Sequence, residues 1–544
     1  MPDRTAPPRT FFGGGQASIG NDILANGDLV ISADFGTSGV KVGVVDSDLN
    51  ILARVTETYP LALGGNGFAE QNPEDWWAGF TRAVAALHRE LPDLRKRVGA
   101  IVFCSQVCSV ICADENGTPL RPCLTWMDKR GAAVGNKLIG GFPSVHGYRA
   151  DKGLIWLALA NGAPAKNGMD PTAKFVWVRE NEPEIWARTR WLLDARDWLV
   201  ARATGEITSC AESANLTWVM DTRRGREGWS ERLCKMVGVP IERMPPIVQG
   251  EACVGGLTKK AAGELGLDRD VDVLGGTIDV TAAALGAGEV EDGALHISVA
   301  TSAWIAGFFP GRRLSVPHAF ATITSGLDYR PLLIASQENA GSAMQWVVEN
   351  TGGDMQDALQ TMGPLMADDP MFLPWMTGER VPVDDRRLRG TFHGLGLHHD
   401  TDALRRAAVE GVVQNLRWAF GLVSRQRGAD RRGPVSLVGG AAATPAFAQM
   451  LADALDREVR VGEARHAGML GAATLAAPVM GWADSATQAA ARLGQRANAI
   501  YTPDPVRVDL MALRAERLNR IRPDIVRSYR RNGGHGDEQG TFEP

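Results

Sequence analysis

Long apolar runs and cysteines are both scarce in this sequence. No stretch reaches the roughly 18 apolar residues of a membrane span, and residues 1–27 lack the basic start and apolar block of a secretory leader. Seven cysteines in 544 residues are a low and odd number, which favours reduced thiols over a disulfide framework. We therefore expect a soluble, cytoplasmic protein without disulfides.

Charge of one sign is not in excess either. The 58 Lys and Arg residues stand against 63 Asp and Glu residues, which gives a formal net charge of −5 and a pI of about 6.1. Such a chain has no broad basic field for nucleic acid or an anionic membrane. We expect neither of these as a partner, and the balance favours a small molecule.

Three of the cysteines, Cys104, Cys108 and Cys112, recur at four-residue spacing. On a helix this spacing would present three thiols on one face, as in a metal site. The surrounding residues are apolar and small, however, and residues 100–112 are typical of a buried strand and its turn. We favour the strand over the metal site.

The chain is too long for a single hydrophobic core, because 544 residues exceed the usual size of one domain. Its β-like apolar runs alternate with helical stretches such as 73–90 and 403–425, which indicates an α/β protein. The predicted strands are Leu29–Ala33, Gly43–Val45, Ala100–Phe103, Val271–Leu274, Leu295–Val299 and Val435–Val438.

Two of these strands, at 29–33 and 295–299, run into turns of small residues, so we expect two similar halves. The segment 287–293, rich in Gly, Glu and Asp, is the expected boundary. We predict domains at residues 29–287 and 288–524, between mobile polar tails at residues 1–28 and 525–544.

The turn after the first strand, Asp34-Phe-Gly-Thr-Ser-Gly-Val-Lys41, is suited to phosphate. Its small residues let backbone N–H groups and hydroxyls approach a phosphate, Lys41 adds positive charge, and Asp34 can hold a hydrated Mg²⁺. The same residues also spell a β-hairpin with an Asx-type turn. The two interpretations are compatible, and the sequence leaves both open.

An acidic residue, Asp279, follows a predicted buried strand and a glycine pair and precedes an Ala-rich helix. Open α/β sheets place ligands at this carboxyl edge of their strands. A carboxylate there can accept the proton of a substrate hydroxyl while that oxygen attacks a γ-phosphate. The alternative is a helix N-cap, which is the commoner role of Asp in such a setting.

A third strand, ending at Val438, runs into Gly439 and Gly440 and then a helix. Bare backbone at two glycines would let a nucleotide lie against the turn and the helix start. Close packing of the helix on the sheet explains the same glycines equally well.

Together and in this order, the motifs resemble those of the FGGY carbohydrate kinases, from about Leu29 to about Arg522. The most specific match is Met169-Asp-Pro-Thr-Ala-Lys-Phe-Val-Trp-Val-Arg-Glu-Asn181, which is similar to a signature of that family. Further matching segments are Glu70–Trp77, Trp126–Arg130, Phe372–Pro382, Gly390–Leu395 and Gly439–Asp453.

This resemblance implies two actin-like (ribonuclease H-like) domains with a cleft between them. Sugar is then held mainly by the first domain, and ATP with Mg²⁺ mainly by the second. It also implies an enzyme that phosphorylates a primary hydroxyl of a ketose or polyol, most like the xylulose kinases of the family. Family members are often dimers, which leaves a homodimer open, and the sequence itself gives no argument on oligomeric state.

By position, the resemblance also assigns roles to individual residues. Asp279 is the catalytic base. The sugar-contacting positions are Gln106, Val107, Cys108, Asp128 and Asp279; the ATP-binding positions are Gly36, Thr37, Ser38, Lys41, Thr301, Ser302, Gly439, Gly440, Ala441 and Ala442; and the Mg²⁺ positions, through water, are Asp34 and Asp279.

Some positions depart from the xylulose kinase pattern. Val107 and Cys108 replace a Met-His pair that touches the sugar, Val280 replaces a frequent Asn, and Ala300 replaces the usual Gly of the second phosphate turn. Losing an imidazole removes hydrogen bonds that discriminate between sugars. A kinase for another pentulose or a tetritol, such as ribulose or erythritol, and a non-catalytic ATP-gated binding protein stay open.

Trp304 could line a ligand pocket, but with fifteen tryptophans in the chain we interpret it as a core residue.

Overall fold

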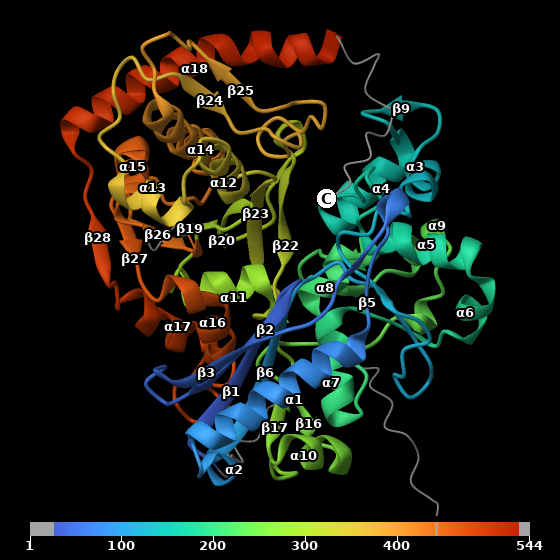
Figure 1. The fold of residues 1–544 in the computed structure, drawn as a ribbon. Coiled ribbons are helices and arrows are strands. Elements are labelled where there is room, and N and C mark those ends of the chain that lie inside the picture. Colours follow the sequence, from blue (N-terminus) through green and yellow to red (C-terminus); the bar gives the residue numbers. More distant parts are fainter. Residues whose placement is uncertain (1–26, 441–443, 532–544) are drawn as a thin grey trace, which may run out of the picture.

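The computed structural model describes residues 27–440 and 444–531 (Figure 1). Two large β-sheets, each flanked by helices, dominate it and confirm the α/β prediction. Each strand predicted from the sequence overlaps an observed one. Among the described residues, no helix is long and apolar enough to cross a membrane.

The first sheet is built around a buried hairpin and a parallel strand. Its order is β16 (Cys253–Gly256), β17 (Asp272–Leu274), β6 (Val98–Ser105), β1 (Leu29–Phe35), β2 (Gly39–Val45) and β3 (Ile51–Thr58). β1 lies antiparallel to β2 and parallel to β6. β6 is buried along its whole length, as a continuous apolar run in a covered sheet should be.

The second sheet repeats this arrangement. Its central order is β23 (Pro331–Gln337), β20 (Ala303–Phe308), β19 (Leu295–Val299), β26 (Val435–Val438) and β27 (Val459–Val461). Here too the first strand, β19, pairs antiparallel with the next strand and parallel with a much later one, β26. The shared order confirms that the chain consists of two similar halves.

Two helices lie between the sheets, side by side in Figure 1. α11 (Asp279–Gly286) and α16 (Ala467–Thr474) approach so closely that a Cβ on Gly471 would overlap the Ala282 carbonyl oxygen. α16 belongs to the second half by sequence, yet it packs on β1, where Ser32 Oγ donates to the Met469 carbonyl oxygen at 2.6 Å. The two halves are therefore joined by direct helix packing.

The cysteine-rich segment is strand, as predicted. Cys104 lies on β6 and Cys112 on β7 (Ile111–Ala113), so the spacing does not place these thiols on one face of a helix. All seven cysteines are free thiols.

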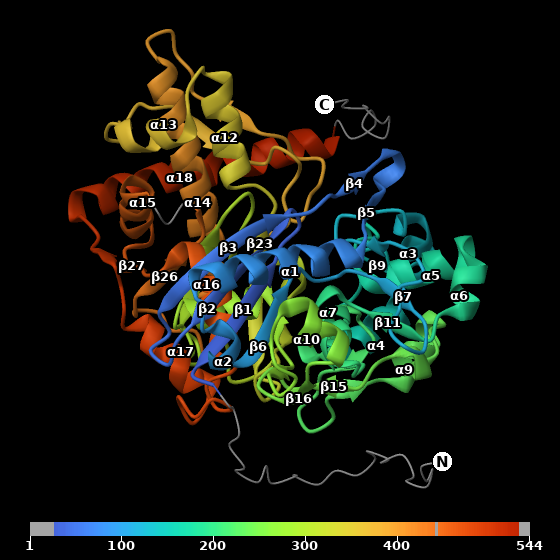
Figure 2. The same cartoon turned by 60° about the horizontal axis from the view of Figure 1, so that its bottom comes forward.

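The C-terminal tail begins later than predicted. α18 (Pro505–Arg531) includes residues 525–531, because Ile525, Val526 and Tyr529 pack with Trp418 in one apolar cluster. Figure 2 shows α18 running along α14 (Thr401–Val423) and α15 (Pro445–Leu455). Residues 1–26 and 532–544, which hold most of the predicted tails, lie outside the described residues.

Candidate active site

The carboxyl ends of neighbouring strands bring Asp34, Gln106 and Asp279 together. Asp34 lies on β1 opposite Cys104 of β6, and the Cys104 Sγ atom is 3.7 Å from Asp34 Oδ1. Gln106 directly follows β6, and Asp279 directly follows β18 (Thr277–Ile278), which pairs with β6. These three side chains thus share the edge at which open α/β sheets bind ligands.

Asp279 opens α11 but does not cap it. The N-cap is Ile278, which makes no side-chain capping bond, and Asp279 Oδ1 accepts from the adjacent Val280 N–H at 2.8 Å. Burial and the negative charge of Asp34 raise the pKa of Asp279 to about 7. A carboxylate with this pKa can take up a proton at neutral pH, as a general base must.

Asp34 is enclosed between β2 and the start of α16. Burial raises the pKa of Asp34, and the exposed Lys41, its cross-strand neighbour, counters that rise. A Cβ on Gly468 would lie 2.8 Å from Asp34 Oδ2, so the glycine lets the helix start come close to the carboxylate. Two nearby carboxylates that oppose each other's ionisation favour a bound cation.

The turn between β1 and β2 is the predicted hairpin. It closes with a bond of 2.9 Å from the Gly36 N–H to the Gly39 carbonyl oxygen. Thr37 Oγ1 accepts from Trp126 Nε1 at 2.9 Å, and Ser38 is exposed. The turn therefore presents small polar residues beside Asp34, as a phosphate site requires.

The turn between β19 and β20 mirrors the first one in the second half. The Ala300 N–H donates to the Ser302 carbonyl oxygen at 2.9 Å, and Thr301 is exposed at the tip. Ala300 does not adopt a positive φ. The replacement of the family's glycine by alanine therefore has no backbone cost here.

The predicted nucleotide turn begins beside this second hairpin. Gly439 has a φ of 94°, and a Cβ there would overlap the Val299 carbonyl oxygen, so glycine is required. Gly440 is exposed, with open space where a Cβ would stand. The other two predicted positions, Ala441 and Ala442, lie outside the described residues.

Gln106 is connected to the first phosphate turn through Gln71. Gln106 Nε2 donates to Gln71 Oε1 at 2.9 Å, and Gln71 Nε2 donates to the Thr37 carbonyl oxygen at 2.8 Å. Gln106 Oε1 is buried and has no hydrogen-bond partner within the described part of the chain. This acceptor is available to a ligand at the sheet edge.

The next residues are held in an unusual backbone conformation. Cys108 has a φ of 63°, and its N–H and that of Ser109 donate to the Asp194 carboxylate at 3.2 and 3.0 Å. The buried Lys174, from the most specific family segment, donates to the Cys108 carbonyl oxygen at 2.7 Å. Val107 and Cys108 themselves stay partly exposed. Lys174 and Asp194 thus position this segment rather than contact a ligand.

Asp128 is bound on several sides by neighbouring groups of the protein. It is fully buried, and its Oδ2 accepts from the Ala69 N–H at 3.0 Å and from Arg130 Nε at 2.9 Å. Arg130 also pairs with Glu70. The carboxylate therefore holds two segments together and has no exposed surface for a sugar in this structure.

Sequence reasoning missed several residues at this site. Gln71 and Trp126 lie in segments that matched the family, so the resemblance was the available signal for them. Asp194 stands in the sequence only as a single acidic residue before a helical stretch, and no motif marks it as part of a site. Arg380 was not missed, since it lies in the matching segment Phe372–Pro382; its positive charge, from the second half, counters the burial-driven rise in the pKa of Cys108 in the first half.

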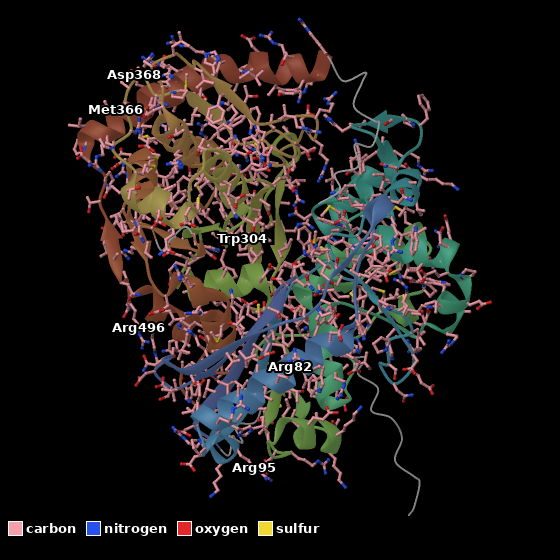
Figure 3. All side chains as sticks on the ribbon, viewed as in Figure 1. Arg82, Arg95, Trp304, Met366, Asp368 and Arg496 are labelled. Carbon is pink, nitrogen blue, oxygen red and sulfur yellow. The ribbon has the colours of Figure 1, made fainter. Side chains whose placement is uncertain are left out.

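Trp304, on β20, belongs to an apolar cluster shared by the two halves that also contains Val107 and Val280. Figure 3 shows it in the central part of the molecule. Its Nε1 is buried and has no hydrogen-bond partner among the described residues. Trp304 is itself partly exposed and packs against this core, and it brings an unused donor to the interface of the halves.

Family models match both halves of the chain. Residues 29–286 match the N-terminal domain of the FGGY family of carbohydrate kinases, and residues 316–480 match the C-terminal domain of the same family. The chain belongs to the FGGY family of carbohydrate kinases. It is therefore a carbohydrate kinase, an enzyme of a family that uses ATP to phosphorylate sugars.

Curated FGGY relatives cover most of the chain. The xylulose kinase of Lactococcus lactis is 26% identical over 88% of this chain and 93% of its own length. The xylulose kinase of Escherichia coli is 29% identical over 82% and 89%, and the gluconokinase of Bacillus subtilis is 24% identical over 84% and 88%.

Solved structures share the two-domain FGGY fold. A structure described as a xyloylose kinase from Brucella ovis has a TM-score of 0.82 and 26% identity, and covers 92% of this chain and 99% of that chain. The xylulose kinase from Rhodospirillum rubrum has a TM-score of 0.77 and 23% identity over 91% and 99%. The predicted two-domain kinase fold is confirmed.

Proposed function

We propose that this chain transfers the γ-phosphate of ATP to a primary hydroxyl of a ketose or polyol, with D-xylulose as the first candidate. The observation that carries the proposal is the convergence of Asp34, Gln106 and Asp279 at one sheet edge beside a phosphate-type turn. Relatives that match most of the chain and are named xylulose kinases support the choice of sugar.

In this proposal Asp279 accepts the proton of the attacking hydroxyl. The hydroxyl oxygen bonds to the γ-phosphorus while the bond from that phosphorus to the bridging oxygen of ADP breaks, and ADP leaves. The turns at Gly36–Ser38 and Thr301–Ser302, with Lys41 and Gly439–Gly440, would hold the phosphates and the nucleotide. Residues 29–287 would hold mainly the sugar, and residues 288–524 mainly ATP.

Asp34 and Asp279 fit the Mg²⁺ that such a transfer uses. The charge of Asp34 raises the pKa of Asp279, and burial raises the pKa of both. Carboxylate oxygens, directly or through water, are the ligands that Mg²⁺ takes in proteins. Bound there, the ion would offset negative charge on the transferring phosphate. ATP as co-substrate also fits a cytoplasmic location.

Two unpaired polar atoms favour a sugar over ATP hydrolysis alone. Gln106 Oε1 is a buried acceptor and Trp304 Nε1 a buried donor, and neither has a partner among the described residues. Sugar hydroxyls supply both donors and acceptors. The second candidate, a kinase for ribulose or erythritol, is favoured by the thiol at Cys108, which replaces a sugar-contacting His of the family pattern, and by the apolar Val280, which replaces a polar Asn and makes the site less polar.

ADP formation from Mg-ATP with D-xylulose, D-ribulose, erythritol, D-gluconate and glycerol tests this proposal, with ³¹P NMR to identify the phosphorylated hydroxyl. We expect one ketose or tetritol to accelerate ADP formation and to carry phosphate on a primary hydroxyl. Binding of ATP without acceleration by any compound in the panel would instead indicate the ATP-gated binding protein.

A further inference from the structure

A cavity of about 560 Å³ lies in the second half, at the edge of the sheet opposite to the one that carries the phosphate turns. It is enclosed by the end of α14, the end of α15 and the middle of α18 (Figure 2), of which α15 contacts both of the others. Arg431 and Arg457, which line it, precede β26 and β27. The cavity is therefore at the amino ends of strands whose carboxyl edge carries Gly439.

The cavity wall is strongly basic. It is lined by five arginines and, among the described residues, by a single acid, Asp456. The arginines are Arg417, Arg425, Arg431, Arg457 and Arg522. Of these five arginines, only Arg457 has a carboxylate of the described chain within 4 Å of its guanidinium group, that of Asp430 at 3.8 Å. The remaining positive charges have no acidic partner there.

Arg522 is the decisive residue of this cavity. It is only 9% exposed, it forms neither a hydrogen bond nor an ion pair within the described part of the chain, and its guanidinium nitrogens stay accessible from the cavity that it lines. Its guanidinium stacks on the Trp418 ring at 3.8 Å. Burial and the charge of Arg417 lower the pKa of Arg522 to about 10. A buried charge without a partner is costly unless an anion compensates it.

A purely structural role explains only part of the cluster. Arg417 Nε donates to the Ala454 carbonyl oxygen at the end of α15, and Arg457 Nε donates to the Gly433 carbonyl oxygen, both at 2.7 Å. Such bonds satisfy orphan carbonyls at helix and loop ends. They do not explain why Arg522 and the two exposed arginines at the rim of the cavity, Arg425 and Arg431, gather there.

We propose that this cavity binds a small anion that carries more than one phosphate group, at a site separate from the phosphoryl-transfer centre. The faces of the two aromatic rings at the cavity, those of Trp418 and Phe420, are covered by Arg522 and Arg457. The wall therefore offers guanidinium groups rather than bare rings. Guanidinium groups match phosphate oxygens in geometry and charge.

Isothermal titration calorimetry with inorganic pyrophosphate, at fixed ionic strength and on the full chain, tests the proposal. We expect Arg522→Met to weaken pyrophosphate binding by at least about tenfold, since it removes a charge-assisted contact. The control is Arg520→Gln, which removes an equally charged but exposed residue from the same helix and should leave the affinity unchanged. Orthophosphate should bind the wild type at least about tenfold more weakly.

Because pyrophosphate resembles part of ATP, the experiment also has to distinguish pyrophosphate binding in this cavity from binding at the ATP site. We expect Arg522→Met to keep its affinity for ATP. Pyrophosphate binding that survives Arg522→Met, no binding to the wild type, or equal binding of orthophosphate would overturn the proposal. Should Arg522→Met lose its fold by circular dichroism, the double variant Arg425→Met and Arg431→Met on the exposed rim decides by the same criteria.

Discussion

Gln106 Nε2 donates to Gln71 Oε1 at 2.9 Å, and both side chains are almost wholly buried. Through this bond a predicted sugar residue is linked to the turn predicted to bind phosphate, because Gln71 also holds the Thr37 carbonyl oxygen. Transfer between a sugar and a nucleotide requires both to be aligned within a fraction of an ångström. Through its bonds to Gln106 and to the Thr37 carbonyl oxygen, Gln71 fixes the position of one group relative to the other.

Gln71→Leu should therefore impair the reaction more than it impairs the fold. The variant loses the bonds to Gln106, to the Thr37 carbonyl oxygen and to Trp76 Nε1. We expect kcat/KM for the sugar to fall about tenfold to a hundredfold, which corresponds to about 1 to 3 kcal/mol for a disrupted buried network. Steady-state kinetics measure this.

The control for this variant is Gln426→Leu, at the end of α14 and away from the site. It should leave kcat/KM unchanged. Normal kinetics in Gln71→Leu would contradict the alignment role.

The rate should depend on the ionisation of Asp279. Burial and the charge of Asp34 raise the pKa of Asp279 to about 7. A base must be unprotonated to accept a proton, so kcat/KM for the sugar should fall below about pH 7, by tenfold per pH unit. Raising the Mg²⁺ concentration should move this limb to lower pH, because a cation beside Asp34 offsets the charge that raises the pKa. A profile that stays flat from pH 8 to pH 5.5 would contradict this assignment.

A buried histidine should make the fold sensitive to acid. His296, on β19, is fully buried with neither ring nitrogen bonded in the described chain, and burial lowers its pKa to about 4. The folded state binds this proton less readily than the unfolded state, whose His titrates near 6.5. Its contribution to the free energy of unfolding is present above about pH 6.5 and is lost, by roughly 3 kcal/mol, as the pH falls to about 4.

Urea titrations across this pH range measure that loss. His296→Leu should reduce the decline in unfolding free energy between pH 6.5 and pH 4, whereas His393→Leu, at an exposed position, should leave the decline as in the wild type. Equal acid sensitivity of the two variants would show that His296 is not responsible.

Local patterns in the sequence predicted the strands, whereas the residue roles at the site came from the family resemblance and stay predictions. Leu295–Val299 is a strand because a short apolar run with β-branched residues is a local signal. Asp279 followed from its glycine pair and strand in the same way. The bond between Asp194 and the Cys108 N–H joins residues 86 positions apart, and no local pattern reports such a contact.

The differences from expectation have similar physical causes. The resemblance assigned Asp128 to the sugar, which stays a prediction, and no local pattern reports that Arg130 and the Ala69 N–H also bond to that carboxylate. The polar composition of the C-terminal residues predicts a tail from residue 525, whereas Ile525 and Tyr529, one turn apart on α18, pack against the rest of the second half.

Release of ADP in the presence and absence of the best sugar, by the wild type and by Asp279→Asn, tests the central claim most directly. The Asn side chain keeps the shape of Asp and cannot act as a base. We predict sugar-stimulated release by the wild type, and a loss of at least about a hundredfold in kcat for Asp279→Asn with ATP affinity retained. Undiminished turnover by Asp279→Asn, or wild-type ADP release that does not respond to any sugar, would contradict the account.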